Sequence, residues 1–365
     1  MAEVASARLT AELGFRRQRR GRIILAGCAL AALAGMLLTI TVGPLAISPA
    51  DVATVLAARI GIGDTGQIST VKIGVIEGIR APRAALGMLV GASLGIAGAA
   101  MQGFFRNPLA DPGLIGVSSG GALAAVSVIV LGGAMLAPFV DALGAFALPI
   151  AAFGGSLVTV LLIYRLATID NRVIVATMLL AGVAANALAA SGLGYMIFLA
   201  DDAQLRDLSF WTLGSLGGAT WARVWPALTL MIVAVAGLLS LMRPMNALLL
   251  GEADAATLGI EVERIKRRAA LMTALGVGAA TAVCGVITFV GLVVPHLVRL
   301  MTGPDHRYVL PGAALLGGAL VLFSDVVARM AVSPAELPLG VVTAALGAPF
   351  FFWLLLRDKR SGTLG

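Results

Sequence analysis

The sequence predicts an all-α, polytopic membrane protein with ten transmembrane helices. Of its 365 residues, 59% are apolar and only 12% are charged, which is about half the charged fraction of a typical soluble protein. The mean hydropathy of +0.99 describes the whole chain, so the apolar excess is not confined to one anchor. This composition excludes a soluble enzyme, a disulfide-rich secreted scaffold and a nucleic-acid-binding module, although the pI of 10.2 would suit the last of these.

Ten apolar stretches account for the predicted helices. A helix needs roughly 20 mostly apolar residues to cross the ~30 Å hydrocarbon core of a bilayer. The strands of a membrane barrel would instead show alternation over ~10 residues, and the sequence has none. The predicted spans are residues 23–42, 84–104, 117–131, 140–164, 173–199, 224–242, 269–289, 291–301, 310–328 and 337–356.

The eighth stretch, residues 291–301, is short, because as a helix it would reach only ~16 Å. Lys and Arg accumulate on the cytoplasmic side of membrane proteins. With ten helices and a cytoplasmic N-terminus, 19 of the 26 cations lie inside and 7 outside. Without the eighth helix the division falls to 15 and 11. The charges therefore favour ten helices with both termini in the cytoplasm, and the alternative is an interfacial loop at 291–301.

The remaining segments define the predicted domain organisation. Residues 1–22 form an Arg-rich cytoplasmic extension, 23–356 a single membrane domain, and 357–365 a cytoplasmic tail. We expect outer loops at 43–79 and 200–221 and a cytoplasmic loop at 251–268. Within this last loop, residues 251–259 predict a two-turn helix, because acidic residues occupy the first turn and a glycine ends it.

Small residues recur every four positions along the second predicted span. Because packing holds helices together in lipid, small side chains at this spacing allow two backbones to approach closely. The stripe predicts that the second helix lies at the centre of the bundle. It consists of Gly87, Gly91, Gly95, Ala99 and Gly103.

The inventory of reactive groups predicts no catalytic residue and no metal site. His296 and His306 lie in no cluster with metal-ligand spacing, and the two cysteines indicate neither a disulfide framework nor a ligand set. No Gly-x-x-x-x-Gly-Lys-Ser/Thr sequence is present to bind ATP phosphates. A carrier driven by an ion gradient would use buried carboxylates, but Asp325 is the one acid well inside a predicted span, and Arg329 follows it on the same helix face. A partner is therefore expected to supply the energy.

Several motifs, in order from about residue 44 to 356, closely resemble the permeases of iron-chelate and cobalamin ABC importers, the FecCD family. They are Arg80-Ala-Pro-Arg83, Gly98-Ala-Ala-Met-Gln102, Arg106-Asn-Pro-Leu-Ala-Asp-Pro112, Gly116-Val-Ser-Ser-Gly-Gly-Ala122, Phe210-Trp-Thr-Leu-Gly-Ser-Leu216, Phe289-Val-Gly-Leu-Val-Val-Pro-His-Leu-Val-Arg299, Asp325-Val-Val-Ala-Arg329 and Glu336-Leu-Pro-Leu-Gly-Val341.

The resemblance implies a cobalamin-importer-like, type II permease of the bacterial inner membrane. It implies a homodimer with the translocation path at its interface, two ATPase subunits on the cytoplasmic side that bind ATP and Mg²⁺, and a periplasmic substrate-binding protein. The permease itself would bind no cofactor and carry out no covalent chemistry. A secondary carrier running on an ion gradient is the rival hypothesis from another class.

Three arginines match the positions that receive acidic residues of the binding protein in this family. Arg80, Arg83 and Arg329 all fall outside in the charge count, against the inward bias of the other cations. Arg–carboxylate pairs offer bidentate geometry and electrostatic steering. The alternative is that these side chains anchor helix ends at the interface, with Asp325 already occupying Arg329.

Two cytoplasmic segments match functional elements of the family. Glu252 to Gly259, including Thr257 and Leu258, match the coupling loop that sits in a groove of the ATPase. Asn107, Pro108, Asp111 and Pro112 form a predicted tight turn, which either gates the path or simply ends one helix and begins the next.

The transported substrate is expected to be haem, with a ferric siderophore or cobalamin as the alternative. The segment 204–221 looks most like the haem-importing branch of the family. It places Arg206 beside Phe210 and Trp211 on the outer side, and a cation with aromatic rings suits a flat macrocycle that bears propionates. The alternative is a local ion pair of Arg206 with Asp202 or Asp207.

Overall fold

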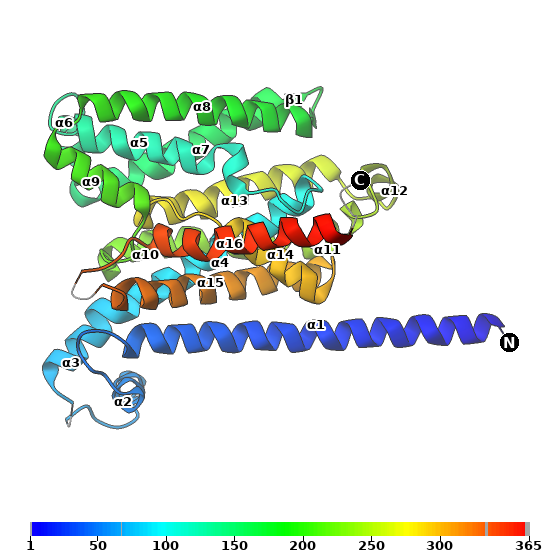
Figure 1. Ribbon diagram of the computed structural model, residues 1–365, viewed down its shortest axis with the longest axis horizontal. Helices are drawn as coiled ribbons and strands as arrows, with labels where there is room; N and C mark the ends of the chain where they lie inside the picture. Colours follow the sequence, from blue (N-terminus) through cyan, green and yellow to red (C-terminus); the bar gives the residue numbers. More distant parts are fainter. Residues whose placement is uncertain (1, 67, 333–334, 362–365) are drawn as a thin grey trace.

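The computed structural model describes residues 2–66, 68–332 and 335–361, with side chains except those of residues 2–15, 355 and 357–361. The described chain is a bundle of long helices lying side by side (Figure 1). The α-helices are α1 (Ala2–Thr41), α2 (Pro49–Arg59), α3 (Thr70–Val75), α4 (Ala81–Phe104), α5 (Val117–Leu131), α6 (Ala137–Leu143), α7 (Ala147–Ala167), α8 (Val175–Leu199), α9 (Asp202–Leu213), α10 (Trp221–Leu239), α11 (Met242–Leu248), α12 (Glu252–Thr257), α13 (Val262–Cys284), α14 (Val290–Thr302), α15 (His306–Met330) and α16 (Leu339–Ser361).

Short elements join the helices. A π-helical turn, η1 (Ile76–Arg80), leads into α4, and 3-10 turns η2 (Pro112–Ile115) and η3 (Gly144–Phe146) precede α5 and α7. The strands β1 (Thr168–Ile169) and β2 (Arg172–Val173) form an antiparallel hairpin between α7 and α8, with Thr168 opposite Val173.

Each of the ten predicted spans overlaps a described helix, namely α1, α4, α5, α7, α8, α10, α13, α14, α15 and α16. Among the described residues, six of these helical segments are long and apolar enough to cross a membrane, and α5, α14 and α16 are shorter apolar helices. The short eighth span is a helix, α14, rather than a loop. The seventh predicted span corresponds to α13, which belongs to neither group and carries charged residues in its first turns.

Some predicted boundaries differ from the observed ones. The seventh span was expected to reach Phe289, but α13 ends at Cys284 because Gly285 adopts φ +73°. The fourth span was expected to begin at residue 140, but Gly144, with φ +51°, separates α6 from α7. The expected break at residue 22 lies inside α1, and the loop 251–268 is shorter than expected, because α13 begins at Val262. The expected tail begins within α16, and residues 362–365 lie outside the described residues.

The small-residue stripe makes α4 the centre of the bundle, as predicted. This helix packs against α15, α13, α14, α10 and α1, and most of its residues are buried. A Cβ added to Gly91 would lie 2.1 Å from the carbonyl oxygen of Gly317, and one on Gly98 would lie 1.8 Å from that of Gly291. Glycine is therefore required at both helix crossings, since any side chain would separate the backbones.

The bundle has two distinct ends (Figure 1). At one end, the α2 end, lie α2, α3, the C-terminus of α1, α9, the C-terminus of α15 and the N-terminus of α16 with the described residues 335–338 that precede it. At the other, the α12 end, lie α12, the β1–β2 hairpin and the N-terminus of α1. The predicted docking residues fall at the α2 end and the predicted coupling residues at the α12 end, so the two groups are separated by the length of the bundle.

Candidate functional site

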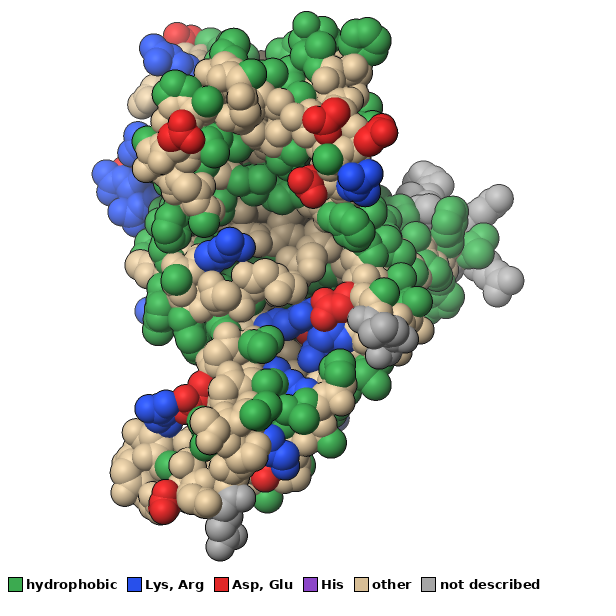
Figure 2. All heavy atoms as spheres, turned by 90° about the vertical axis from the view of Figure 1, so that its left-hand side faces the viewer, with side chains coloured by type: hydrophobic (Ala, Val, Ile, Leu, Met, Phe, Trp, Pro, Cys, Tyr) green, Lys and Arg blue, Asp and Glu red, His purple; other side chains and the backbone are tan. Residues whose placement is uncertain are grey.

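A cluster of three buried arginines lies at the α2 end. Arg80 is the last residue of η1, Arg83 lies in the first turn of α4, and Arg329 lies in the last turn of α15. Their exposed fractions are only 4%, 6% and 6%. Figure 2 views this end, where basic side chains and an acidic side chain gather beside a hollow in the middle of the face.

Two of these arginines bind the C-terminus of α1. Arg80 donates from Nη1 to the carbonyl oxygens of Ile40 (2.8 Å) and Thr41 (2.9 Å), and from Nη2 to that of Leu45 (2.6 Å). Arg329 donates to the carbonyl oxygens of Val42 (2.9 Å) and Thr39 (3.2 Å). The last carbonyls of a helix lack intrahelical partners and carry the negative end of its dipole. Arg80 and Arg329 therefore cap α1 and fix its end against α4 and α15.

The third arginine joins two carboxylates that are distant in sequence. Arg83 donates from Nε (3.0 Å) and Nη2 (2.8 Å) to Asp325 Oδ1, and from Nη1 (3.0 Å) and Nη2 (2.8 Å) to the two carboxylate oxygens of Glu336. Asp325 also pairs with Arg329, at 3.2 Å between Oδ2 and Nε. The predicted Asp325–Arg329 pair is thus confirmed, and Arg83 and Glu336 extend it into a network.

The structure brings the three docking arginines together at one end, but all of them already have partners within the chain. The sequence placed Glu336 at the start of a family motif but did not indicate a role for it. The backbone carbonyl groups that accept hydrogen bonds from Arg80 were not predicted either, because every residue has a carbonyl group and the sequence does not show which ones an arginine will bind. Docking of an acidic partner on this cluster stays a prediction.

At the α12 end, the predicted coupling helix is present. Glu252 and Asp254 occupy the first turn of α12, and the hydroxyl of Thr257 donates to the carbonyl oxygen of Asp254 at 2.7 Å. Leu258, which is 63% exposed, and Gly259, with φ +77°, follow the helix. The helix therefore presents an apolar side chain to its surroundings next to a glycine that turns the chain.

A buried lysine anchors this helix. Lys266 of α13 is 3% exposed, and its ammonium group lies 2.8 Å from Glu252 Oε2 and 3.2 Å from Glu263 Oε1. The other carboxylate oxygen of Glu263 accepts a hydrogen bond from the amide of Val173 in β2 at 2.9 Å. Lys266 and Glu263 thus join α12, α13 and the hairpin. The spacing of three between the two residues could have indicated their pair, but nothing in the sequence indicated the link to Val173.

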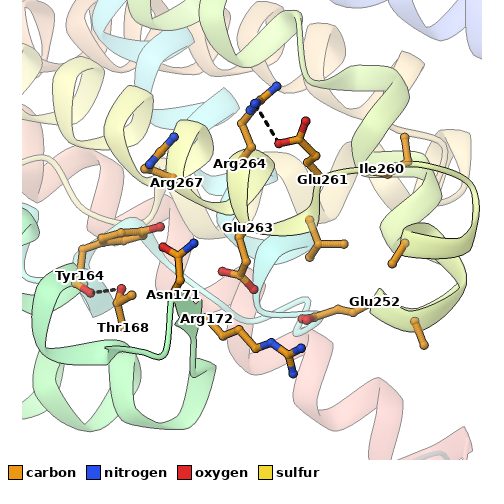
Figure 3. A pocket seen from close by; sticks show the side chains of 13 residues that line it. Tyr164, Thr168, Asn171, Arg172, Glu252, Ile260, Glu261, Glu263, Arg264 and Arg267 are labelled. Carbon is orange, nitrogen blue, oxygen red and sulfur yellow. Dashed lines mark hydrogen bonds and ion pairs between the residues drawn. The ribbon is translucent and has the colours of Figure 1, made fainter.

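A cavity of about 720 Å³ lies between α12 and the hairpin. Figure 3 shows Glu252, Glu261 and Glu263 with Arg172, Arg264 and Arg267 around it. Arg264 pairs with Glu261 at 2.9 Å. Charged side chains of both signs therefore line this cavity together with apolar ones.

The predicted turn after α4 is held by its own side chains. Asn107 Oδ1 accepts from the amide of Leu109 at 2.9 Å, and Asp111 Oδ1 accepts from the amide of Gly113 at 2.7 Å. Burial raises the pKa of the Asp111 carboxyl, although the hydrogen bond from Gly113 opposes this. Pro108 lies in the turn and Pro112 begins η2. These contacts support the role of ending one helix and starting the next.

On α9, two of the three expected substrate-path residues share a surface. Arg206 and Phe210, four residues apart, line one shallow depression, and Phe210 is 65% exposed. Trp211 lies outside this depression: it is partly buried, packs against the cluster of Ala125, Ala152 and Ala282, and lines a separate hollow. Its place in the substrate path stays a prediction. Among the described side chains Arg206 has no ion-pair partner within 4.0 Å, so the local pairs with Asp202 and Asp207 are not formed.

Comparison with known proteins adds the decisive observation. The model of the FecCD transport family matches residues 17–357. The chain belongs to this family. It is therefore a permease subunit of an ABC importer of the iron-chelate and cobalamin type, which confirms the predicted family and fold class.

Two relatives illustrate the range within the FecCD family. The chain is 46% identical over 287 residues to the hemin transport system permease protein HmuU of Yersinia pestis, covering 78% of this chain and 84% of that protein. It is 43% identical over 301 residues to the cobalamin import system permease protein BtuC of Halobacterium salinarum, covering 82% and 76%. A solved inward-facing structure of a metal-chelate type ABC transporter matches with a TM-score of 0.79 and 27% identity, covering 92% of this chain and 99% of that one.

Proposed function

We propose that this permease imports haem across the bacterial inner membrane as a homodimer, with both termini in the cytoplasm. The α12 end then faces the cytoplasm and the α2 end the periplasm. Two ATPase subunits, which bind ATP and Mg²⁺, drive transport from the α12 end, and a periplasmic binding protein delivers the substrate at the α2 end. The permease contributes no covalent chemistry and no bound cofactor.

The observation that carries the choice of haem is the pairing of an unpartnered cation with an exposed aromatic ring on α9. Arg206 lies at the α2 end without an ion-pair partner among the described residues, and Phe210 lines the same depression. A guanidinium group can bind a propionate while a ring contacts the porphyrin face. The 46% identity to a permease named for hemin supports the same choice.

The proposal also assigns roles to the two ends of the bundle. Arg80, Arg83 and Arg329 form the docking site for acidic residues of the binding protein, and α12 with Leu258 and Gly259 forms the contact with the ATPase. Leu258 supports the second role, because a side chain that is 63% exposed beside a short polar helix suits a protein partner.

The test is uptake into proteoliposomes that contain the permease with the ATPase and binding protein of its own transport system. ATP-dependent accumulation of haem, and none with the permease alone, is the expected result. Transport by the permease alone on an ion gradient would overturn the ATP-driven mechanism.

Cobalamin is the second candidate substrate, because a relative named for cobalamin import is almost equally similar, at 43% identity. Haem, cobalamin and a ferric siderophore are therefore compared in the same vesicles. Accumulation of either alternative without haem would refute the choice of haem and leave the permease assignment in place.

A further inference from the structure

We propose that Glu336 is an internal latch on the docking cluster, which an acidic side chain of the binding protein must displace from Arg83. This inference rests on the proposed docking role of the arginines and assigns a regulatory role to a residue of the connector between α15 and α16. The latch keeps the start of α16 attached to α4 until the partner arrives.

The two carboxylates on Arg83 occupy different edges of its guanidinium group. Asp325 takes the Nε–Nη2 edge, and its side chain is 1% exposed. Glu336 takes the Nη1–Nη2 edge, and its side chain is 41% exposed. Asp325 is enclosed and shared with Arg329, so it is a fixed partner. Glu336 is reachable from outside the chain and is the exchangeable one.

Exchange at this edge has a small net cost. An incoming carboxylate would form the same bidentate pair that Glu336 gives up, so one charge-assisted contact replaces another. In the latched state, three arginines are balanced by the two carboxylates of Asp325 and Glu336. Release of Glu336 leaves the cluster more positive, which favours an acidic partner.

The position of Glu336 allows the exchange to affect other elements. Three residues further on, the amide of Leu339, the first residue of α16, donates to the carbonyl oxygen of Gly214 at 2.9 Å. Gly340 also lies close to the end of α9, since an added Cβ would come within 2.4 Å of the Leu213 carbonyl oxygen. A displaced connector therefore acts on α16 and on α9, the helix that carries Arg206.

The experiment is a binding titration of the system's own binding protein against the permease–ATPase complex, with the parent chain and Glu336→Gln. The substitution keeps the shape of the side chain but removes its charge, so the latch is weakened while the fold is retained. Since partly exposed ion pairs contribute roughly 0.5–1 kcal/mol, we expect binding to be tighter by about two- to five-fold. Basal ATP hydrolysis should rise as well, because the connector is released without the partner.

The matched control is Glu77→Gln, which also removes an acid paired with an arginine, Arg59, at the α2 end. It should leave both the affinity and the basal hydrolysis unchanged, and an equal gain in both variants would overturn the latch in favour of a general charge effect. Unchanged or weaker binding of Glu336→Gln would also overturn it.

Arg83→Gln separates failure of the latch from failure of the docking site. If Arg83→Gln weakens binding while Glu336→Gln has no effect, the docking role stands and the latch is wrong. If Arg83→Gln in a folded complex binds as tightly as the parent, both are wrong.

Discussion

The ammonium group of Lys266 and the carboxylate of Glu252 lie 2.8 Å apart and fix α12 to the first turns of α13. The lysine is buried, whereas the side chain of Glu252 is 47% exposed. A helix of six residues, as α12 is, is too short to be stable by itself in water. Its orientation therefore depends on this contact, together with the contacts of Glu263.

Lys266→Met should uncouple the two ends of the transporter. The apolar chain fills the same space, but Glu252 and Glu263 lose their cation, and α12 loses its anchor to the hairpin. Removing one partner of a fully buried pair costs ~3–5 kcal/mol, and the exposure of both carboxylates lowers the cost here to ~1–2 kcal/mol. We expect a modestly lower melting temperature in detergent and a loss of ATPase stimulation by the binding protein.

Lys72→Met is the control for Lys266→Met, because it breaks a lysine–aspartate pair, with Asp51, at the opposite end of the bundle. It should retain stimulation of the ATPase. If Lys266→Met is stimulated as strongly as the parent, the lysine has a purely structural role.

Gly259→Trp should prevent productive contact with the ATPase without affecting membrane insertion. An added Cβ at Gly259 meets no atom within 4 Å, so a bulky side chain would point into open space beside α12. The positive φ of +77° adds strain of ~1–2 kcal/mol for a non-glycine residue. We expect normal amounts of inserted protein and loss of stimulated ATP hydrolysis.

Gly303→Trp is a matched control for Gly259→Trp, since Gly303 also has a positive φ, +83°, and open space around its Cβ. It follows α14 and does not belong to the α12 segment. Equal loss of stimulation in both variants would show that backbone strain, and not contact at α12, is responsible.

Gly98→Ala should destabilise the bundle strongly. Its methyl group would lie 1.8 Å from the carbonyl oxygen of Gly291, so α4 and α14 would have to separate, at a cost of ~1–3 kcal/mol or more. The measurement is the melting temperature of the purified protein in detergent. Gly27→Ala, where an added Cβ meets nothing within 4 Å, should melt as the parent does, and an equal effect of both would contradict the close crossing.

The close packing at Gly91 could be predicted from the sequence, because a helix period of 3.6 residues places every fourth small residue on one face. Gly98 does not belong to that stripe, and its contact with Gly291 was not predicted. The positions of nine spans could be predicted because a membrane-spanning helix needs a long apolar stretch. The eighth is too short for that argument and was predicted from the distribution of Lys and Arg. The same helix period explains why Trp211 does not share the depression of Arg206 and Phe210. Arg206 and Phe210, four apart, share a face, whereas a separation of five places Trp211 on another face, where it is partly buried.

Contacts between distant segments could not be predicted in this way. Arg83 and Glu336 are 253 residues apart, and they meet because the chain folds α15 and the start of α16 against other elements. The capping of α1 by Arg80 involves carbonyl groups, which every residue carries. The sequence predicted the pair of Arg329 with Asp325, but it did not indicate the partners of Arg80 and Arg83 within the chain.

Arg206→Ala tests the most specific part of the proposed function. Arg206 is a cation without an ion-pair partner among the described residues, so its removal breaks no ion pair within the chain. If a haem propionate pairs transiently with it while Phe210 contacts the ring, haem uptake into proteoliposomes should fall several-fold. Basal ATP hydrolysis should stay at the level of the parent, because the substitution releases no contact that holds helices together in the described part of the chain.

Two further variants decide how a result for Arg206→Ala is interpreted. Arg206→Lys should recover part of the uptake, since the charge is kept but the planar, bidentate group is lost. Arg59→Ala, which removes an exposed outer arginine that is already paired with Glu77, should transport haem as the parent does. A general loss of positive charge at the surface would slow transport in both alanine variants to the same extent. Uptake by Arg206→Ala at the rate of the parent would remove this residue from the path of the substrate and leave the choice of haem to the direct comparison of substrates.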